Sequence, residues 1–85
     1  MEIGYSAKFI KIYNSLEKEL AEEIYEKINL FRDEKNHKML KVHKLHGKLK
    51  TEYSFSVNYK VRVIFEKIGK NEVILHAIGR HEMYK

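Results

Sequence analysis

The hydrophobic period changes once along these 85 residues, and this change limits the folds that the chain can adopt. Between residues 6 and 31 the apolar side chains recur three or four positions apart, as on one face of a helix. They are Phe9, Ile12, Tyr13, Leu16, Leu20, Ile24, Ile28 and Phe31. From Tyr53 onward they recur at every second position, as in strands with one buried face. The chain therefore combines a helical block with a strand block that follows it.

Two helices are expected in the first block. Asn14 and Ser15 interrupt it, and either side chain can cap a new helix, with Glu17 and Glu19 favourably placed in its first turn. We predict the second helix over residues 16–32, with its acidic face toward water.

The second block predicts an antiparallel meander of three strands, with turns at residues 58–59 and 68–72. We expect one buried face to hold Tyr53, Phe55, Val57, Val61, Val63, Phe65, Val73, Leu75 and Ala77, and the other face of the last strand to hold Ile74, His76 and Ile78. Residues 2–6 predict a short further strand before the helices. The fold class is α+β, with a helical hairpin packed on one face of the sheet.

Length and composition exclude several classes of protein. We expect a single domain over residues 1–85, too short for a multidomain enzyme. Cysteine is absent, which excludes disulfides, thiol catalysis and cysteine-ligated zinc. No apolar run approaches the ~18 residues of a membrane span. The first five residues lack the basic start and apolar core of a signal peptide, so we expect a cytoplasmic protein without membrane contact.

Charge is distributed unevenly. Residues 35–85 carry 12 basic and 4 acidic side chains, a net +8, whereas residues 1–34 carry 5 basic and 8 acidic ones, a net −3. Residues 35–50 alone hold six lysines, three histidines and no acid. Such a segment is either a solvated connector or a surface for nucleic acid, and charge alone does not decide between them.

Three segments of the chain resemble a known family. They are YSAKFIK at residues 5–11, LKVHKLHGKLKTEYSFSVNYKVRVIFE at 40–66 and ILHAIGRHEMY at 74–84. In this order and spacing they resemble the RelE/ParE superfamily, the toxins of type II toxin–antitoxin modules. The most specific parts are the Leu-x-Gly before an aromatic strand at 45–47, the strand core at 62–65 and the terminal Gly-x-His with a following tyrosine at 79–84.

The resemblance implies one of two activities. Members similar to RelE, YoeB and YafQ are mRNA interferases, metal-independent endoribonucleases that act at the ribosome, whereas ParE-like members inhibit gyrase. In the nuclease reaction the ribose 2′-hydroxyl attacks the adjacent phosphorus and leaves a 2′,3′-cyclic phosphate and a 5′-hydroxyl. This reaction requires a base, a cation for the phosphorane and an acid for the leaving oxygen, and we expect no cofactor and no metal.

Arg62 is the candidate cation. It alternates with Val61 and Val63, so we expect it on the sheet face that the helices do not cover. A guanidinium there can hold a phosphate through two parallel hydrogen bonds, and the resemblance implies contact with the scissile phosphate. The alternative is a surface pair with Glu52 or Glu66.

The resemblance also implies the acid and the base. His81 matches the general acid, and Tyr84 nearby would orient the RNA or the leaving group. His43 aligns with the proton acceptor of related nucleases, but a small shift of the alignment puts His46 there, and both stay open. An imidazole suits either task because it changes charge near neutral pH.

Three further cations are expected to bind RNA phosphate. Lys48 and Lys50 alternate and share a face, and Arg80 precedes the terminal histidine. A zinc site on the histidines of residues 37–46 is not expected, because neither an acid nor a cysteine accompanies them.

The second class of function is a binding module without catalysis, either gyrase-inhibiting or inactive. Arg62 and the histidines favour the nuclease over this alternative. The implied partners are a small acidic antitoxin and mRNA on the translating ribosome, with DNA bound only indirectly through an antitoxin complex. A helix–turn–helix is not expected, since the second helix is acidic.

Overall fold

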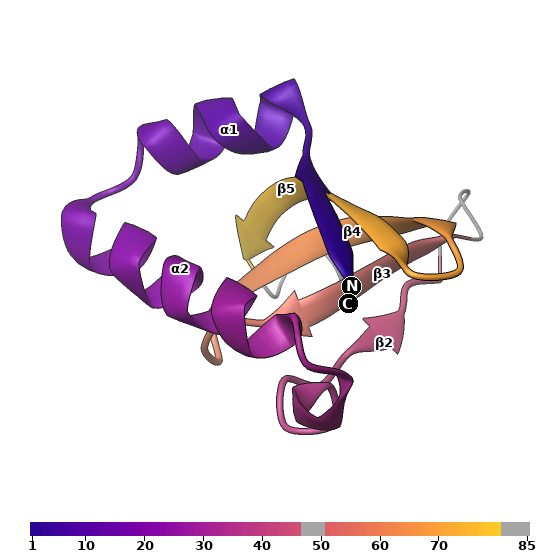
Figure 1. The fold of residues 1–85 in the computed structure, drawn as a ribbon. Coiled ribbons are helices and arrows are strands. Elements are labelled where there is room, and N and C mark those ends of the chain that lie inside the picture. The colour runs from indigo at the N-terminus through magenta and orange to yellow at the C-terminus, as the bar shows by residue number, and fades with distance from the viewer. Residues whose placement is uncertain (47–50, 81–85) are drawn as a thin grey trace.

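The computed structural model describes residues 1–46 and 51–80, which form two helices beside a five-stranded sheet (Figure 1). The strands lie in the order β1-β5-β4-β3-β2. The predicted α+β class, with the helices packed on one face of the sheet, is confirmed. The elements are β1 (Glu2–Tyr5), α1 (Ala7–Asn14), α2 (Lys18–Phe31), the 3-10 turn η1 (Glu34–Asn36), β2 (His43–Lys44), β3 (Glu52–Ser56), β4 (Val61–Gly69) and β5 (Glu72–Arg80).

The first helix ends at the predicted break, and the second is shorter than the predicted residues 16–32. Helix α1 begins where the Ser6 hydroxyl accepts a hydrogen bond from the Phe9 amide at 3.0 Å. It ends at Ser15, whose hydroxyl donates to the Ile12 carbonyl at 2.7 Å. Helix α2 starts after Glu17, which makes no capping hydrogen bond through its side chain. The prediction that Asn14 or Ser15 caps the second helix is wrong, because α2 begins after Glu17 and both the hydroxyl and the amide of Ser15 donate to the Ile12 carbonyl of α1.

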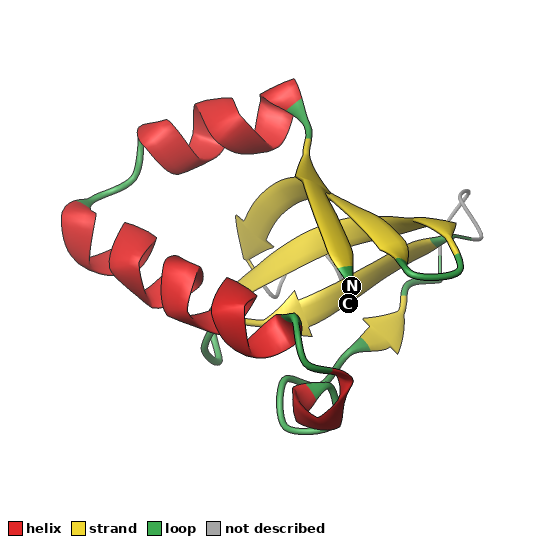
Figure 2. Cartoon of the chain, viewed as in Figure 1, coloured by secondary structure: helices red, strands yellow, loops and turns green. Residues whose placement is uncertain are grey.

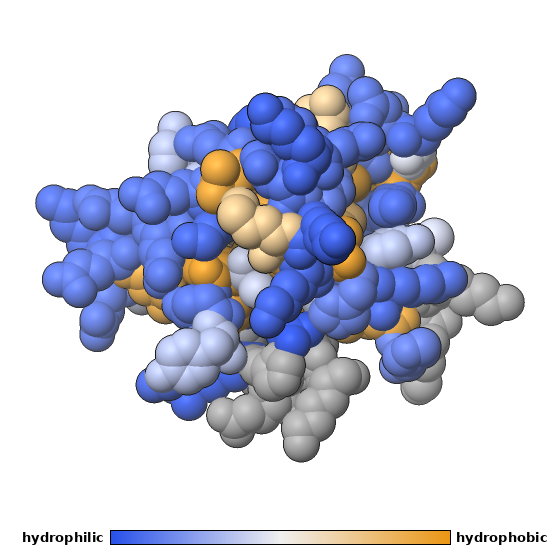
Figure 3. All heavy atoms as spheres, turned by 90° about the horizontal axis from the view of Figure 1, so that it is seen from below, coloured by the Kyte–Doolittle hydropathy of each residue, from blue (hydrophilic) through white to orange (hydrophobic). Residues whose placement is uncertain are grey.

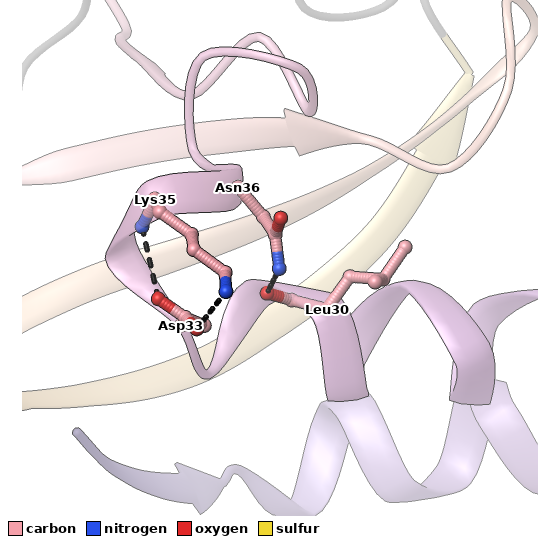
Figure 4. Close-up of polar contacts among 4 residues, drawn as sticks. All are labelled: Leu30, Asp33, Lys35 and Asn36. Atoms are coloured by element: carbon pink, nitrogen blue, oxygen red, sulfur yellow. Dashed lines mark hydrogen bonds and ion pairs between the residues drawn. The ribbon is translucent and has the colours of Figure 1, made fainter.

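The turn η1 fixes the start of the basic segment to the end of α2. The Asp33 carboxylate accepts a hydrogen bond from the Lys35 amide at 3.1 Å and lies 3.5 Å from the Lys35 ammonium (Figure 4). The Asn36 side chain donates to the Leu30 carbonyl at 2.9 Å. One of the carbonyls at the end of α2 is thereby satisfied, and the chain leaves the helix in a defined direction.

The sheet contains the predicted meander and one strand that was not predicted. Strands β3, β4 and β5 pair antiparallel, and β1 lies parallel to β5 at one edge. The turns fall near residues 58–60 and 70–71, close to the predicted positions. Strand β2 pairs antiparallel with β3 and forms the other edge. Its two residues are too short to show an alternating pattern in the sequence.

Stacked aromatic rings join α2 to the sheet. The Phe31 ring lies 4.4 Å from that of Phe55 and 4.8 Å from that of Phe65, and all three side chains are buried. The His37 ring stacks on the other side of the same phenylalanine at 4.8 Å, with its Nε2 2.8 Å from the Phe31 carbonyl. The core therefore fills the layer between the helices and one face of the sheet (Figure 2).

A β-bulge changes the alternation in β5. Leu75 and Ala77 pair with the consecutive residues 64–65 of β4, so His76 is the extra residue. Beyond it Ile78 packs in the main core, while Ala77 packs on the opposite face. The prediction that placed Ala77 with the core and Ile78 opposite is wrong, because both follow the bulge. A strict period of two cannot include an extra residue.

The face seen in Figure 3 is mostly hydrophilic, with apolar side chains visible between the hydrophilic ones. The large exposed apolar side chains are Tyr5, Ile10, Tyr25, Leu30, Met39, Tyr59 and Ile68. No helix within residues 1–46 and 51–80 has both the length and the apolar character needed to cross a membrane.

We predict that Phe31→Ala lowers the free energy of unfolding by about 3–5 kcal/mol, because it opens a cavity between α2 and the sheet. Asn29→Ala is the matched control on the exposed face of the same helix and should change it by about 0.5 kcal/mol or less. Urea unfolding followed by circular dichroism measures both. A loss below about 1 kcal/mol for the phenylalanine variant would contradict the packing described here.

Candidate active site

Arg62 lies on the sheet face that the helices leave uncovered, as the alternation predicts. Val61 and Val63 on either side of it pack into the helix-covered core. The arginine itself is half-buried. Within the described residues no carboxylate lies at ion-pair distance from its guanidinium. A pairing with the acids of neighbouring strands therefore does not occupy this cation.

The guanidinium of Arg62 reaches across β3 to β2. Its Nη1 lies 3.2 Å from Nε2 of His43 and 3.5 Å from Oγ of Ser54. These two partners face each other across the β2–β3 pair. Arg62 itself pairs with Ser56, two residues further along β3, so its side chain runs diagonally over the sheet surface.

The partners of the His43 ring select one protonation form. The Lys41 carbonyl lies 2.9 Å from Nδ1 and can only accept, so Nδ1 carries the hydrogen. The Arg62 guanidinium can only donate, so Nε2 presents its lone pair. This assignment, made from the partners, is the neutral imidazole, whose Nε2 lone pair accepts from Arg62. Because His43 is exposed, a substrate hydroxyl can reach Nε2 once the guanidinium leaves it.

The backbone conformation of Lys41 directs its carbonyl toward the His43 ring. Within residues 1–46 and 51–80 Lys41 is the only non-glycine residue with a positive φ, 56°. Its amide donates to the Lys38 carbonyl at 3.1 Å, which closes a turn directly before β2. The left-handed backbone is sparsely populated by residues with a Cβ, so the surrounding contacts must maintain it.

Ser54 and Ser56 are site residues that the sequence interpretation overlooked. Ser54 is fully buried and bonds to Arg62, while Ser56 is the cross-strand neighbour of that arginine. The signal was present in the pattern Tyr-Ser-Phe-Ser-Val at residues 53–57. Its alternation places both serines on the face opposite the aromatic core, which is the face of Arg62.

The other predicted site residues do not all lie beside Arg62 and His43. His46 is exposed and makes no hydrogen bond to the part of the chain that the structure describes. Arg80 pairs with Val61, so it belongs to the helix-covered face at the end of β5 and not to the face of Arg62. The other predicted residues lie outside the described ranges, namely Lys48, Lys50, His81 and Tyr84.

Positive charge lies at the His43 end of the site, where Lys41 is exposed. The alternation that places Ser54 and Ser56 on the face of Arg62 also places Glu52 there, paired with Glu66 further along the strands. The acids of α2 gather elsewhere, in a depression that they form with Asn58 and Lys60. This group consists of Glu17, Glu19, Glu22, Glu23 and Glu26. An anionic ligand is thus attracted to the Arg62–His43 end of the sheet face and repelled from α2.

Solved structures share this fold over nearly the whole chain. YoeB in its complex with YefM from Staphylococcus aureus has a TM-score of 0.71 and 19% identity, with 95% of this chain and 97% of that one covered. RelE in the archaeal RelE–RelB complex from Pyrococcus horikoshii has a TM-score of 0.70 and 17% identity, with 93% and 92% covered. YafQ in the DinJ–YafQ complex from E. coli has a TM-score of 0.67 and 18% identity, with 96% and 94% covered.

These similarities confirm the predicted fold, which the chain shares with the solved structures of YoeB, RelE and YafQ. No protein-family model matches the chain, and no curated protein matches it with significant sequence similarity. At such low identity the shared architecture defines a fold, and the chemistry has to be argued from this chain's own residues.

We predict that Lys41→Val, which forces a β-branched residue into the left-handed region, lowers the free energy of unfolding by about 1–3 kcal/mol. Lys41→Gly removes the same charge and accepts that backbone without strain, so it is the matched control. Nitrogen-15 NMR of the His43 ring should show the Nδ1–H form in wild type and in the glycine variant. A neutral ring protonated at Nε2 in wild type would contradict the geometry described above.

Proposed function

We propose that this chain is the toxin of a type II toxin–antitoxin pair, and that it is a metal-independent endoribonuclease that cleaves mRNA on the translating ribosome. The observation that carries the proposal is the contact between Arg62 Nη1 and His43 Nε2, in which a phosphate-binding cation adjoins a neutral proton acceptor. The fold shared with YoeB, RelE and YafQ supports it.

His43 is the proposed base. Its Nε2 takes the proton of the ribose 2′-hydroxyl while the freed O2′ bonds to the adjacent phosphorus. The positive charge that forms on the ring is shared with the Lys41 carbonyl, which accepts from Nδ1 at 2.9 Å. A carbonyl at this position both orients the imidazole and stabilises its protonated form. His46 has no comparable contact with the described residues, which favours His43 among the two candidates that the sequence left open.

Arg62 is the proposed phosphate ligand. An incoming phosphate offers the guanidinium two charge-assisted hydrogen bonds, which are stronger than its present bond to a neutral imidazole. Arg62 would then move from His43 to the phosphate, and the Nε2 lone pair would become free when substrate arrives. The Arg62 guanidinium would then stabilise the additional negative charge of the phosphorane, because it is already bound to the phosphate on which that charge develops.

The acid and the remaining cations are proposed from the family resemblance. As the P–O5′ bond breaks, His81 gives a proton to the leaving oxygen, so the products are a 2′,3′-cyclic phosphate and a 5′-hydroxyl. Tyr84 would orient the RNA, and Lys48 and Lys50 would hold neighbouring phosphates. Arg80 remains a candidate for phosphate binding, although its register separates it from Arg62.

A small acidic antitoxin is the proposed inhibitor. The net +8 of residues 35–85 attracts an acidic segment, and the YoeB, RelE and YafQ structures above are complexes with YefM, RelB and DinJ. Such a segment would cover the Arg62 face in the cytoplasm, and DNA would be bound only through the antitoxin. The alternative function is gyrase inhibition or binding without catalysis, which would produce DNA breaks or no damage while mRNA stays intact.

We predict that Arg62→Ala lowers the rate of mRNA cleavage on translating ribosomes about 100-fold to 1,000-fold, since it removes a donor to the transition state. His81→Ala should have a similar effect. Lys38→Ala is the control, because it removes an exposed cation from the basic residues 35–50. It should weaken RNA binding only modestly and in a salt-dependent manner. Wild-type products should end in a 2′,3′-cyclic phosphate.

Unchanged thermal unfolding must accompany each of these variants, so that a lost activity is not a lost fold. Full cleavage by folded Arg62→Ala and His81→Ala proteins would contradict the proposed site. Intact mRNA together with DNA double-strand breaks in cells that express wild type would favour the gyrase alternative.

A further inference from the structure

A groove with exposed apolar side chains lies next to the candidate active site. Leu30 from α2, Met39 from the segment before β2 and Tyr59 from the β3–β4 turn line it, and they are 36%, 60% and 83% exposed. Its volume is about 330 Å³, at the low end of ligand pockets, which suits a group of nucleotide size. Large apolar side chains gathered at such exposure indicate a binding surface.

The turn that carries Tyr59 is held in place. The Asn58 side chain accepts hydrogen bonds from the Lys60 and Val61 amides, both at 2.8 Å, and donates to the Glu23 carboxylate of α2 at 2.9 Å. These bonds fix the turn beside α2 (Figure 1). The tyrosine is therefore presented to solvent from an ordered backbone, and its ring can receive a flat ligand without a large cost in entropy.

The groove borders the Arg62–His43 pair through two residues, although neither member of the pair lines it. Lys41 lines the groove, and its carbonyl holds the His43 ring. Ser56 also lines it and is the cross-strand neighbour of Arg62. An RNA with a phosphate on the guanidinium therefore has the groove beside it, at the edge where these two residues lie.

The charges around the groove favour a nucleotide over an acidic peptide. Lys27 and Lys41 line it and no carboxylate does. Beyond Asn58, however, the surface becomes acidic, because that residue also borders the depression formed by the glutamates of α2. Negative charge is thus favoured only at the end next to Arg62, and an uncharged aromatic group is favoured at the far end.

From these observations we infer that the groove binds the base of a nucleotide adjacent to the cleaved phosphate, stacked on Tyr59 and in contact with Met39. The inference rests on the proposed function, since it takes RNA as the ligand of the Arg62 site. Every base offers a flat π-face, so the contact supplies affinity and position at this nucleotide. The ammonium of Lys60, 5.6 Å from the tyrosine ring centroid, adds positive charge at the stacking surface.

Binding of an uncleavable RNA tests the inference on the full-length protein. The probe is a 2′-O-methyl RNA trinucleotide, and the matched probe has the same backbone with one abasic position. Methyl NMR of Met39 should show a shift with the first probe, and moving the abasic position should identify one nucleotide whose base is required for it. Tyr59→Ser should raise the Kd of the complete probe about 5-fold or more and Tyr59→Trp should restore it, because stacking is lost and regained. Tyr25→Ser removes another exposed tyrosine, outside the groove, and should leave the Kd unchanged.

Several results would overturn the inference. They are an unchanged Kd in folded Tyr59→Ser, the same Met39 shift with every abasic probe, and no shift with any probe at millimolar concentration. A Met39 shift that depends on protein concentration without RNA would show that a second copy covers the groove, and would also overturn it. The outcome is separable from that of the proposed function. Cleavage lost in Arg62→Ala with no effect at Tyr59 refutes only the groove assignment, whereas full cleavage in Arg62→Ala with a raised Kd in Tyr59→Ser refutes the nuclease site and leaves only base binding in the groove.

Discussion

The contacts of Phe31 determine where the candidate active site can form. Its ring stacks on Phe55 and lies tilted against Phe65, which seats the end of α2 on the sheet, and the His37 ring stacks on it as well. The chain therefore leaves the helix at a fixed point, turns at Lys41 and enters β2 beside β3. This seating adds to the contacts that hold β2 at the edge of the sheet, which are its pairing with β3 and the backbone bonds from Leu45 to Glu52 and from Ser56 to Leu40.

The arginine and the histidine come together through the register of three strands. Arg62 on β4 spans β3 to meet His43 on β2, and the buried Ser54 lies between them. Residues 19 positions apart in the sequence thereby form one hydrogen-bonded unit. The unit lies on the sheet face opposite the main core, beside the smaller buried cluster of Leu45, Ile64 and Ala77, and the acids of α2 gather away from it.

Much of this arrangement could be predicted from the sequence, and the failures have physical causes. The periods of 3.6 and 2 indicated both helices, the meander and the direction of Arg62, because amphipathic patterns record which face is buried. Strand β2 was missed because two residues are too few to show an alternating pattern. The faces of Ala77 and Ile78 were exchanged because the bulge at His76 adds one residue to the period of two. The cap of α2 was misplaced because the Ser15 side chain bonds to α1. The choice between His43 and His46 depends on a tertiary contact, which no local pattern records.

The central claim is that His43 and Arg62 act as one catalytic unit, and a double-mutant cycle on mRNA cleavage tests it most directly. We predict that His43→Gln and Arg62→Ala each lose most of the activity and that the double variant is less than about tenfold slower than the slower single one, since residues that act together are not additive. His46→Gln combined with Arg62→Ala is the matched control, in which any small effects should multiply. Losses that multiply fully for His43 and Arg62, or full activity in His43→Gln, would contradict the account.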